Sequence, residues 1–324
     1  MTRAIRFDGH GGPEVLRLVE VDLPQPGEGE ALVRHTAIGV NYIDTYHRSG
    51  LYPKPLPAGL GVEAAGVVEA LGPGVAGVAV GTRVAYVGGS GASYSDAAVV
   101  PAAGLVALPD SITDQTAAGM MLKGLTVEML LERIGKLSRG DTILLHAASG
   151  GVGLIACAWA RHLGVITIGT VGSAAKAELA AAAGCTHTVL YRDENFVERV
   201  REITAGAGVK VVYDSVGKDV FEDSLDCLEP RGLLATFGNA SGQPPAVAPA
   251  TLAAKGSLFV TRPTLFAYIA DPEELRLAAA RLFELVTGDI LPIDVRHRYP
   301  LAEAAQAHRD LEGRRTSGSI ILVP

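Results

Sequence analysis

Short apolar runs alternate with helical patterns through the middle of the chain. The runs are rich in β-branched residues and bounded by turn residues, as buried strands are. They comprise the run that begins at Thr142 and ends before a glycine cluster, followed by Val165–Ile168, Thr188–Leu190, Val209–Tyr213, Leu233–Phe237 and Leu258–Val260. Strands that alternate with helices form βαβ units, whose strands lie parallel in one sheet. We therefore predict an α/β domain with a doubly wound parallel sheet.

The N-terminal part has a different pattern. Its β-like runs are interrupted by Gly and Pro, which is typical of an irregular antiparallel barrel. The clearest runs are Leu32–Gly39, Val62–Leu71 and Thr82–Val87. A helical pattern from Asp114 to Lys136 follows and places the first domain boundary near residue 120.

The C-terminal part predicts two helices and a strand. Beyond Pro263, an acid-rich opening leads into an amphipathic helix that ends near Gly288. A further helix, about 301–311, precedes a closing strand, Ser319–Val323. This tail is too short to form a domain alone, so we expect it to return to the N-terminal barrel.

A glycine turn joins an apolar strand to a helical pattern at 142–156. The turn has the spacing Ala148-x-Gly150-x-x-Gly153, which matches the dinucleotide fingerprint except at its first glycine. Glycines let the backbone approach a pyrophosphate, and the free N–H groups of the helix N-terminus face its oxygens. The sequence therefore predicts a dinucleotide here, with glycines that serve only strand–helix packing as the alternative.

The stretch that follows the second strand favours NADPH over NADH. Sites for NAD usually place an acid about 20 residues after the glycine turn to hold the ribose hydroxyls. Residues 168–176 contain no carboxylate, but they include Ser173 and Lys176. A hydroxyl donor and a positive charge suit a 2′-phosphate, which a carboxylate would repel. The alternative for Lys176 is a solvated helix lysine.

Composition excludes several other classes of protein. The 324 residues exceed one usual hydrophobic core, and 48% hydrophobic with 19% charged residues indicate a folded, soluble chain. The 28 basic and 35 acidic residues give a formal charge of -7 without a basic stretch, so nucleic acid is not expected as a partner. The sequence shows neither a signal peptide nor a membrane-spanning run, so a cytoplasmic location is expected.

The cysteines and histidines do not form a ligand pattern. Cys157, Cys185 and Cys227 are far apart in sequence and are interpreted as small buried hydrophobes. His146, at a strand end, is predicted to be structural, and the other histidines are scattered.

Several motifs, in their order along the chain, resemble one family. They are Gly39–Asp44, Gly61–Gly66, Lys123–Thr126, the glycine turn, Val212–Gly217 and Phe237–Asn239. Together they resemble the zeta-crystallin-like NADPH:quinone oxidoreductases of the medium-chain dehydrogenase/reductase superfamily, especially the bacterial members. The resemblance implies a GroES-like β-barrel catalytic domain (1–122), a Rossmann domain (123–262) and a C-terminal segment (263–324) that returns to the barrel. It places the active site in the cleft between the domains and implies a homodimer through the edge strand Ser257–Thr261.

The resemblance also implies a metal-free reductase. Zinc-dependent relatives carry Cys where this chain has Asn41, and His where it has Val62, and an amide and an isopropyl group cannot replace those ligands. The expected reaction is hydride transfer from NADPH to a quinone. The alternatives are reduction of an α,β-unsaturated carbonyl (a 2-alkenal or enone) and a non-enzymatic NADPH-binding protein with a structural or RNA-binding role.

Candidate catalytic residues lie in or near the first motif. Asn41 is predicted to polarise the acceptor oxygen or to position the nicotinamide. Tyr46 and Tyr52 are predicted to line the quinone pocket, with Tyr46 as a possible proton donor and cofactor contact. Asp44 is expected to orient its neighbours through hydrogen bonds, because a carboxylate stays ionised unless it is desolvated. Packing roles for the tyrosines and a loop cap for Asp44 are the alternatives.

The resemblance assigns the remaining cofactor contacts residue by residue. The pyrophosphate is expected at Gly150, Gly151, Val152 and Gly153. The 2′-phosphate is expected at Gly172, Ser173 and Lys176, with Tyr191, Ser215 and Gly217 around the adenosine. The ribose or nicotinamide is expected at Thr126, Phe237, Gly238 and Asn239. Arg314 and Arg262 complete the set, with Arg314 directed at the phosphates.

Overall fold

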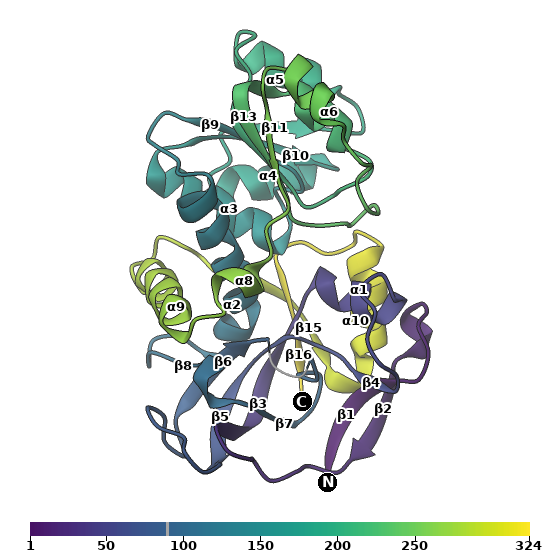
Figure 1. Ribbon diagram of the computed structural model, residues 1–324, viewed down its shortest axis with the longest axis vertical. Helices are drawn as coiled ribbons and strands as arrows, with labels where there is room; N and C mark the ends of the chain where they lie inside the picture. The colour runs from purple at the N-terminus through teal and green to yellow at the C-terminus, as the bar shows by residue number, and fades with distance from the viewer. Residues whose placement is uncertain (89–90) are drawn as a thin grey trace. The chain divides into compact units, whose positions relative to one another are not determined.

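The computed structural model describes residues 1–88 and 91–324, and its contacts divide the chain into two compact units (Figure 1). The first unit contains Met1–Leu125, Ile269–Thr287 and Ile293–Pro324. The second contains Thr126–Tyr268 and Gly288–Pro292. Each unit has its own sheet system and its own buried core, so we describe them separately.

The second unit is built on a six-stranded sheet in the order β11-β10-β9-β12-β13-β14. Its strands are β9 (Thr142–Leu145), β10 (Ile166–Val171), β11 (His187–Leu190), β12 (Val209–Asp214), β13 (Leu228–Thr236) and β14 (Phe259–Thr261). All neighbouring strands are parallel. Leu144, Ile168 and Val212 are fully buried, as the apolar runs predict for a sheet covered on both faces. The predicted doubly wound sheet is confirmed.

Helices connect these strands in the second unit. They are α3 (Gly151–Leu163), α4 (Ala174–Ala183), α5 (Phe196–Ile203), α6 (Phe221–Asp226), α7 (Pro249–Ala254) and α8 (Leu265–Tyr268).

The helix predicted from Asp114 to Lys136 is in fact α2 (Asp114–Glu128), followed by a π-helical segment, Met129–Ile134. Lys136 has a φ of 43°, in the left-handed region, which ends the helical path.

The first unit contains two sheets. The larger has the order β15-β16-β3-β5-β6-β8, with β7 also paired to β3, and the smaller has the order β2-β1-β4. The strands are β1 (Thr2–Phe7), β2 (Arg17–Val21), β3 (Glu30–Val40), β4 (Ala58–Gly59), β5 (Glu63–Leu71), β6 (Arg83–Val87), β7 (Ala97–Pro101), β8 (Leu105–Ala107), β15 (Val295–Pro300) and β16 (Ser319–Val323). All pairings are antiparallel except that of β15 with β16.

Most of the C-terminal segment, Ile269–Thr287 and Ile293–Pro324, belongs to this first unit, whereas residues 263–268 and Gly288–Pro292 belong to the second. In Figure 1 the strand β16 lies among the N-terminal strands, and its backbone pairs with β3 from Ile320 to Leu322. Its helices are α9 (Pro272–Thr287) and α10 (Ala304–Glu312), the latter preceded by a short 3-10 turn, Leu301–Glu303. Helix α1 (Tyr42–Ser49), also in this unit, follows β3 after one residue. Within the described ranges, no helix combines the length and apolar character needed to cross a bilayer.

The three cysteines are buried free thiols, as predicted, but they are not all isolated. The neighbouring Cys185 thiol and burial raise the pKa of Cys157 well above its usual value, and the Cys157 thiol lowers the pKa of Cys185. The two residues are distant in sequence, and the packing of α3 against β10 and the turn after α4 brings them together. His146 is also buried between two hydroxyls, Thr170 Oγ1 at 3.0 Å and Ser224 Oγ at 2.9 Å, which agrees with a structural role.

Candidate functional site

The residues predicted to bind the cofactor follow the carboxyl ends of neighbouring strands in the second unit. The glycine turn follows β9, Gly172 and Ser173 follow β10, the 215–217 loop follows β12 and the 237–239 loop follows β13. Because these strands are parallel and adjacent, their ends share one edge of the sheet (Figure 1). The strand order reverses between β9 and β12, where dinucleotides bind in doubly wound sheets.

The glycine turn has the close packing that its glycines predict. Gly150 is the N-cap of α3, and its N–H donates to the carbonyl oxygen of Ala147 at 2.9 Å. A Cβ atom on Gly153 would lie 2.4 Å from that same oxygen, so a larger residue does not fit there. The first N–H groups of a 13-residue helix lack intrahelical partners and carry its positive dipole end. The turn therefore offers donors to an anion.

Ala148 stands where the dinucleotide fingerprint has its first glycine. The neighbouring strand β10 has a glycine opposite it, which leaves space for the Ala148 methyl group. Ala148 is buried, and a Cβ atom at Gly169 of β10 would lie 2.6 Å from the Ala148 Cβ and 2.6 Å from the Cys185 Sγ. A glycine at position 169 therefore makes room for the extra methyl group at the turn.

The residues predicted around the 2′-phosphate meet at the start of α4. Ser173 is the N-cap of this helix, and its Oγ accepts a hydrogen bond from the Lys176 backbone N–H at 3.4 Å. A hydroxyl that accepts in this way keeps its own proton to donate. A Cβ atom on Gly172 would lie 2.9 Å from the Tyr191 hydroxyl, so Tyr191 packs directly against the turn. These four residues thus form one surface at the end of β10.

The loops after β12 and β13 are tied to each other by Asp214. Its Oδ1 accepts hydrogen bonds from the Val216 N–H at 2.7 Å and the Gly217 N–H at 2.9 Å. Its backbone oxygen accepts from the Phe237 N–H at 2.7 Å. Burial raises the pKa of Asp214, against the effect of these hydrogen bonds. Asp214 was not predicted as a site residue, although it lies in a quoted motif.

Gly238 and Arg262 shape the second of these loops. A Cβ atom on Gly238 would lie 2.2 Å from the Ser215 carbonyl oxygen, so the two loops touch through their backbones. The Arg262 guanidinium donates to the carbonyl oxygens of Thr236 at 3.0 Å and Gly238 at 3.1 Å. Arg262 therefore contacts the loop predicted to face the nicotinamide, and its contact with the cofactor stays a prediction.

In the first unit, Asn41 belongs to a buried cluster of charged residues. It is the N-cap of α1, and its Nδ2 donates to Glu63 Oε2 at 2.7 Å. The other Glu63 oxygen accepts from the Leu122 N–H at 2.7 Å, and the Lys123 Nζ lies 3.6 Å from Oε2. Glu63 is fully buried and the Lys123 side chain is 7% exposed. We call Asn41, Asp44, Glu63 and Lys123 the charged cluster.

Asp44 contacts Asn41 through the capping box of α1, which is the cap role given as the alternative, and its orienting role in catalysis stays a prediction. Its Oδ2 accepts from the Asn41 N–H at 2.8 Å and from the Tyr94 hydroxyl at 2.9 Å. Burial raises the pKa of Asp44 to about 7, with these hydrogen bonds opposing the rise, Glu63 adding to it and Lys123 reducing it. The expectation of a fully ionised carboxylate depended on solvation, which complete burial removes.

A chain of hydrogen bonds leads from Arg48 through His308 and Tyr94 to Asp44, and the donor in each bond follows from the chemistry of these groups. The Arg48 guanidinium faces the His308 Nδ1 at 3.0 Å and pairs with Glu312 at 2.7 Å. Since a guanidinium only donates, Nδ1 accepts, and Nε2 carries the proton that it donates to the Tyr94 oxygen at 3.1 Å. The Tyr94 proton is then directed to Asp44. Burial lowers the pKa of His308 to about 3, so its ring is neutral near pH 7.

Four further predicted residues are placed as follows. The Tyr46 and Tyr52 rings meet edge to face, with centroids 5.2 Å apart, and their place in a quinone pocket stays a prediction. Arg314 is exposed, with a φ of 57°, in the turn after α10 of the first unit. Thr126 is buried in the last turn of α2, where the second unit begins.

The residues at the position of the zinc ligands do not fit a zinc ion. The Asn41 amide donates to Glu63, Val62 is apolar, and the nearby Lys123 ammonium already supplies a positive charge. Across residues 1–88 and 91–324, no three His, Cys, Asp or Glu side chains are grouped so as to hold a metal.

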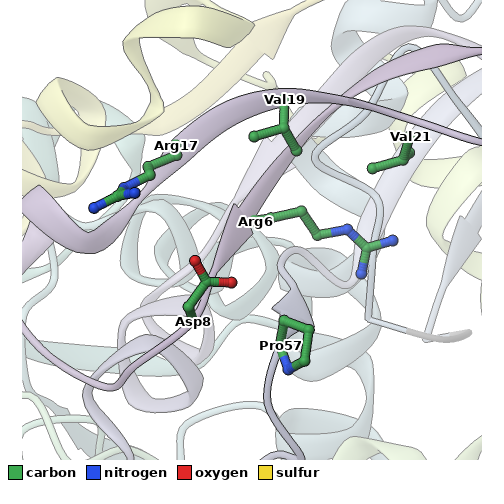
Figure 2. Close-up of a pocket in the computed structure, with 6 residues that line it drawn as sticks. All are labelled: Arg6, Asp8, Arg17, Val19, Val21 and Pro57. Atoms are coloured by element: carbon green, nitrogen blue, oxygen red, sulfur yellow. The ribbon is translucent and has the colours of Figure 1, made fainter.

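One pocket of about 400 Å³ lies at the smaller sheet of the first unit, and the predicted site residues are not part of its lining. It is lined by Arg6, Asp8, Arg17, Val19, Val21 and Pro57. Arg6 and Arg17 face each other across β1 and β2, and Figure 2 shows their guanidinium groups pointing apart. Like charges opposite each other repel, and this divergence leaves no convergent binding group.

Together, a parallel sheet with a glycine turn and an antiparallel sheet unit define the class of two-domain dehydrogenases and reductases. The family profiles agree: an alcohol dehydrogenase GroES-like domain matches residues 27–110, and a zinc-binding dehydrogenase domain matches residues 151–280. A quinone oxidoreductase of Pseudomonas aeruginosa is 52% identical over 325 residues, which cover 100% of both chains. The chain belongs to the quinone oxidoreductase family of the medium-chain dehydrogenase/reductase superfamily, which confirms the resemblance seen in its motifs.

Two further relatives are informative. The crystal structure of Escherichia coli quinone oxidoreductase complexed with NADPH is 49% identical, with a TM-score of 0.98 over 99% of this chain and 100% of that one. A 2-haloacrylate reductase of Burkholderia is 46% identical over 332 residues, which cover 100% of this chain and 99% of the relative. The family thus includes members named for two different electron acceptors.

Proposed function

We propose that this chain transfers a hydride from NADPH to a quinone without a metal ion. The observation that carries the proposal is the glycine-lined carboxyl edge of β9, β10, β12 and β13. It has Ser173 and Lys176 where an NAD site has an acid. NADPH also appears with the quinone oxidoreductase of Escherichia coli, which matches this chain along its whole length.

The phosphate groups, the adenosine and the nicotinamide of NADPH are assigned to the residues predicted from the sequence. The assignment is supported by the place of these residues at the carboxyl edge of the sheet, where Gly153 packs against the Ala147 carbonyl oxygen and Gly172 packs against the Tyr191 hydroxyl. Bound NADPH supplies the hydride. The protein's contribution is to orient the nicotinamide through the 237–239 loop and Thr126, and to polarise the acceptor near Asn41 with Tyr46 and Tyr52 beside it. The domain limits 1–122, 123–262 and 263–324 remain part of the proposal.

A second acceptor class is a conjugated carbonyl compound. The relative named 2-haloacrylate reductase favours it, because a haloacrylate is an alkene activated by a carboxyl group. Hydride addition to a quinone and to an activated alkene places charge on the same kind of conjugated oxygen. The geometry of the site therefore suits both.

Steady-state rates with four acceptors test these alternatives. NADPH oxidation is measured with 1,4-benzoquinone, 1,2-naphthoquinone, a 2-alkenal and 2-chloroacrylate, and we expect the two quinones to give the highest kcat/KM. Higher values for the alkenal or the acrylate would reverse the order of the candidates. Saturable NADPH binding without oxidation by any acceptor would instead support the non-enzymatic alternative.

The proposal includes a homodimer and a cytoplasmic location. The strand β14 is the edge of its sheet, where unpaired backbone groups are able to pair with a second copy, and Phe259 on it is 61% exposed. The free thiols of all three cysteines suit a reducing compartment. Sedimentation of the wild type and of Phe259→Asp tests the dimer. We expect the wild type to be a dimer and the Phe259→Asp variant to be a monomer. A wild type that is a monomer would contradict the proposed homodimer.

A further inference from the structure

The charged cluster holds a buried cation whose hydrogen bonds are not satisfied. The Lys123 Nζ lies 3.6 Å from Glu63, which is an ion-pair distance but too long for a hydrogen bond. Among the described residues, Nζ has no hydrogen-bond partner, although an ammonium carries three donors. Burying such a group without partners is costly, and a ligand oxygen that accepted a hydrogen bond from it would reduce that cost.

The position of Lys123 links it to the residue predicted to face the acceptor. Glu63 Oε2 accepts from the Asn41 amide at 2.7 Å and pairs with the Lys123 ammonium through the same oxygen. One carboxylate therefore holds both groups side by side. The Asn41 amide is neutral and already donates to Glu63, so the positive charge of this pair comes from Lys123.

Hydride transfer to a conjugated carbonyl needs such a charge. When the hydride adds to one end of the conjugated system, an electron pair moves to the carbonyl oxygen at the other end. A proton from water then completes the reduced product, and the nicotinamide is left oxidised. Preorganised donors at the developing oxyanion lower the barrier most in a water-excluded site.

We propose that the Lys123 ammonium donates a hydrogen bond to the acceptor oxygen and stabilises the negative charge that forms there. Lys123 is a catalytic residue in this role, and Glu63 is a positioning residue that holds it beside Asn41. The inference rests on the proposed function, because the acceptor must be a conjugated carbonyl compound. The role applies equally to a quinone and to an α,β-unsaturated carbonyl.

The first experiment compares wild type, Lys123→Met and Lys123→Arg with 1,4-benzoquinone. We expect the uncharged Met variant to lose kcat by about 10²–10³-fold, as happens when one oxyanion donor is removed. The Arg variant keeps the charge and is expected to recover part of the rate. NADPH affinity, measured by fluorescence titration, is expected to stay within about twofold in all three. Lys210→Met, which removes a lysine paired with Asp141 in the other unit, is the control and should keep the wild-type rate.

The second experiment separates charge stabilisation from a structural role. With a series of substituted benzoquinones, the ratio of wild-type to Lys123→Met rates should rise as the hydroquinone anion becomes more basic. The double variant Lys123→Met with Glu63→Gln has no unpaired buried charge and should remain slow. A flat ratio across the series, or recovery of the rate in the double variant, would overturn the proposal for Lys123. If the wild-type protein reduces none of the acceptors, that result would instead contradict the proposed function.

Discussion

The two candidate sites, one in each unit, are built from different kinds of groups. At the carboxyl edge of the second unit, glycines bring backbone groups together, and Gly153 and Gly238 have no space for a side chain. In the first unit, the charged cluster places Asp44, Glu63 and Lys123 in a buried environment where each charge depends on its neighbours. In the proposed function, the first region binds the cofactor through backbone groups, and the second contributes buried charges to the reaction. We therefore expect substitutions in the two regions to have different effects on stability, cofactor binding and activity.

The largest effect is expected at Glu63. Glu63→Gln removes the ion-pair partner of the buried Lys123 ammonium, so we expect the free energy of unfolding to fall by about 3–5 kcal/mol. Urea denaturation measures it. The double variant with Lys123→Met removes both charges and should regain much of the loss. Asp226→Asn, which breaks the exposed pair with Lys255, should cost less than about 1 kcal/mol. Equal losses at the two sites would contradict the contrast between the regions.

Lys176 tests the cofactor preference of the second unit. Lys176→Ala is expected to weaken NADPH binding by about 1.5–3 kcal/mol, the usual contribution of a hydrogen bond to a charged group. NADH, which has no 2′-phosphate, should bind almost as before. Titration with both nucleotides gives the two dissociation constants, and Lys255→Ala serves as the matched control. The same loss for NADH and NADPH would remove the 2′-phosphate assignment.

Gly153 tests whether the turn depends on shape alone. The Cβ atom of Gly153→Ala would lie 2.4 Å from the Ala147 oxygen, so the turn must shift, and overpacking of this kind costs about 1–3 kcal/mol of stability. NADPH affinity should fall with it, while the charged cluster in the other unit is untouched. Thermal unfolding and nucleotide titration measure both effects. Gly9→Ala, where nothing lies within 4 Å of the new Cβ, is the control and should change neither.

His146 gives the smallest expected effect, on the pH dependence of stability. Burial lowers its pKa to about 3, so below its ordinary value of 6.5 the unfolded chain takes up a proton that the folded chain does not. Stability is therefore lost as pH falls through 6.5. Between about pH 7.5 and pH 5.5, His146→Gln should remove about 1.4 kcal/mol of that loss. Urea denaturation at both pH values checks it, and an unchanged pH slope would contradict the burial argument.

The comparison also explains what the sequence predicts well. Strands of the second unit have two buried faces and appear as continuous apolar runs, so β9, β10 and β12 were located to within a few residues. The glycine turn is local in sequence, and its function depends on residues only three apart. By contrast, β2 has an almost wholly exposed sequence, Arg17–Val21, without a buried face to produce an alternation, and it was missed.

The charged cluster was predicted only in part, because its contacts are not local. Asn41 and Asp44 share one motif, but Glu63 and Lys123 lie in separate motifs that were quoted without a role. Arg48 and His308 are 260 residues apart, so no spacing rule connects them. One signal was present in the sequence: Lys123 interrupts the apolar stretch of α2, where a charged side chain needs a partner or a function.

A single-turnover experiment tests the central claim most directly: the chain passes a hydride from NADPH to a quinone. Protein saturated with NADPH, or with NADPH deuterated at the transferred C4 position, is mixed with 1,4-benzoquinone while the absorbance of the reduced nicotinamide is followed. We expect rapid, stoichiometric oxidation that slows with the deuterated cofactor, because the C4–hydrogen bond breaks in the reaction. Oxidation at the rate seen without protein, and without an isotope effect, would contradict the claim.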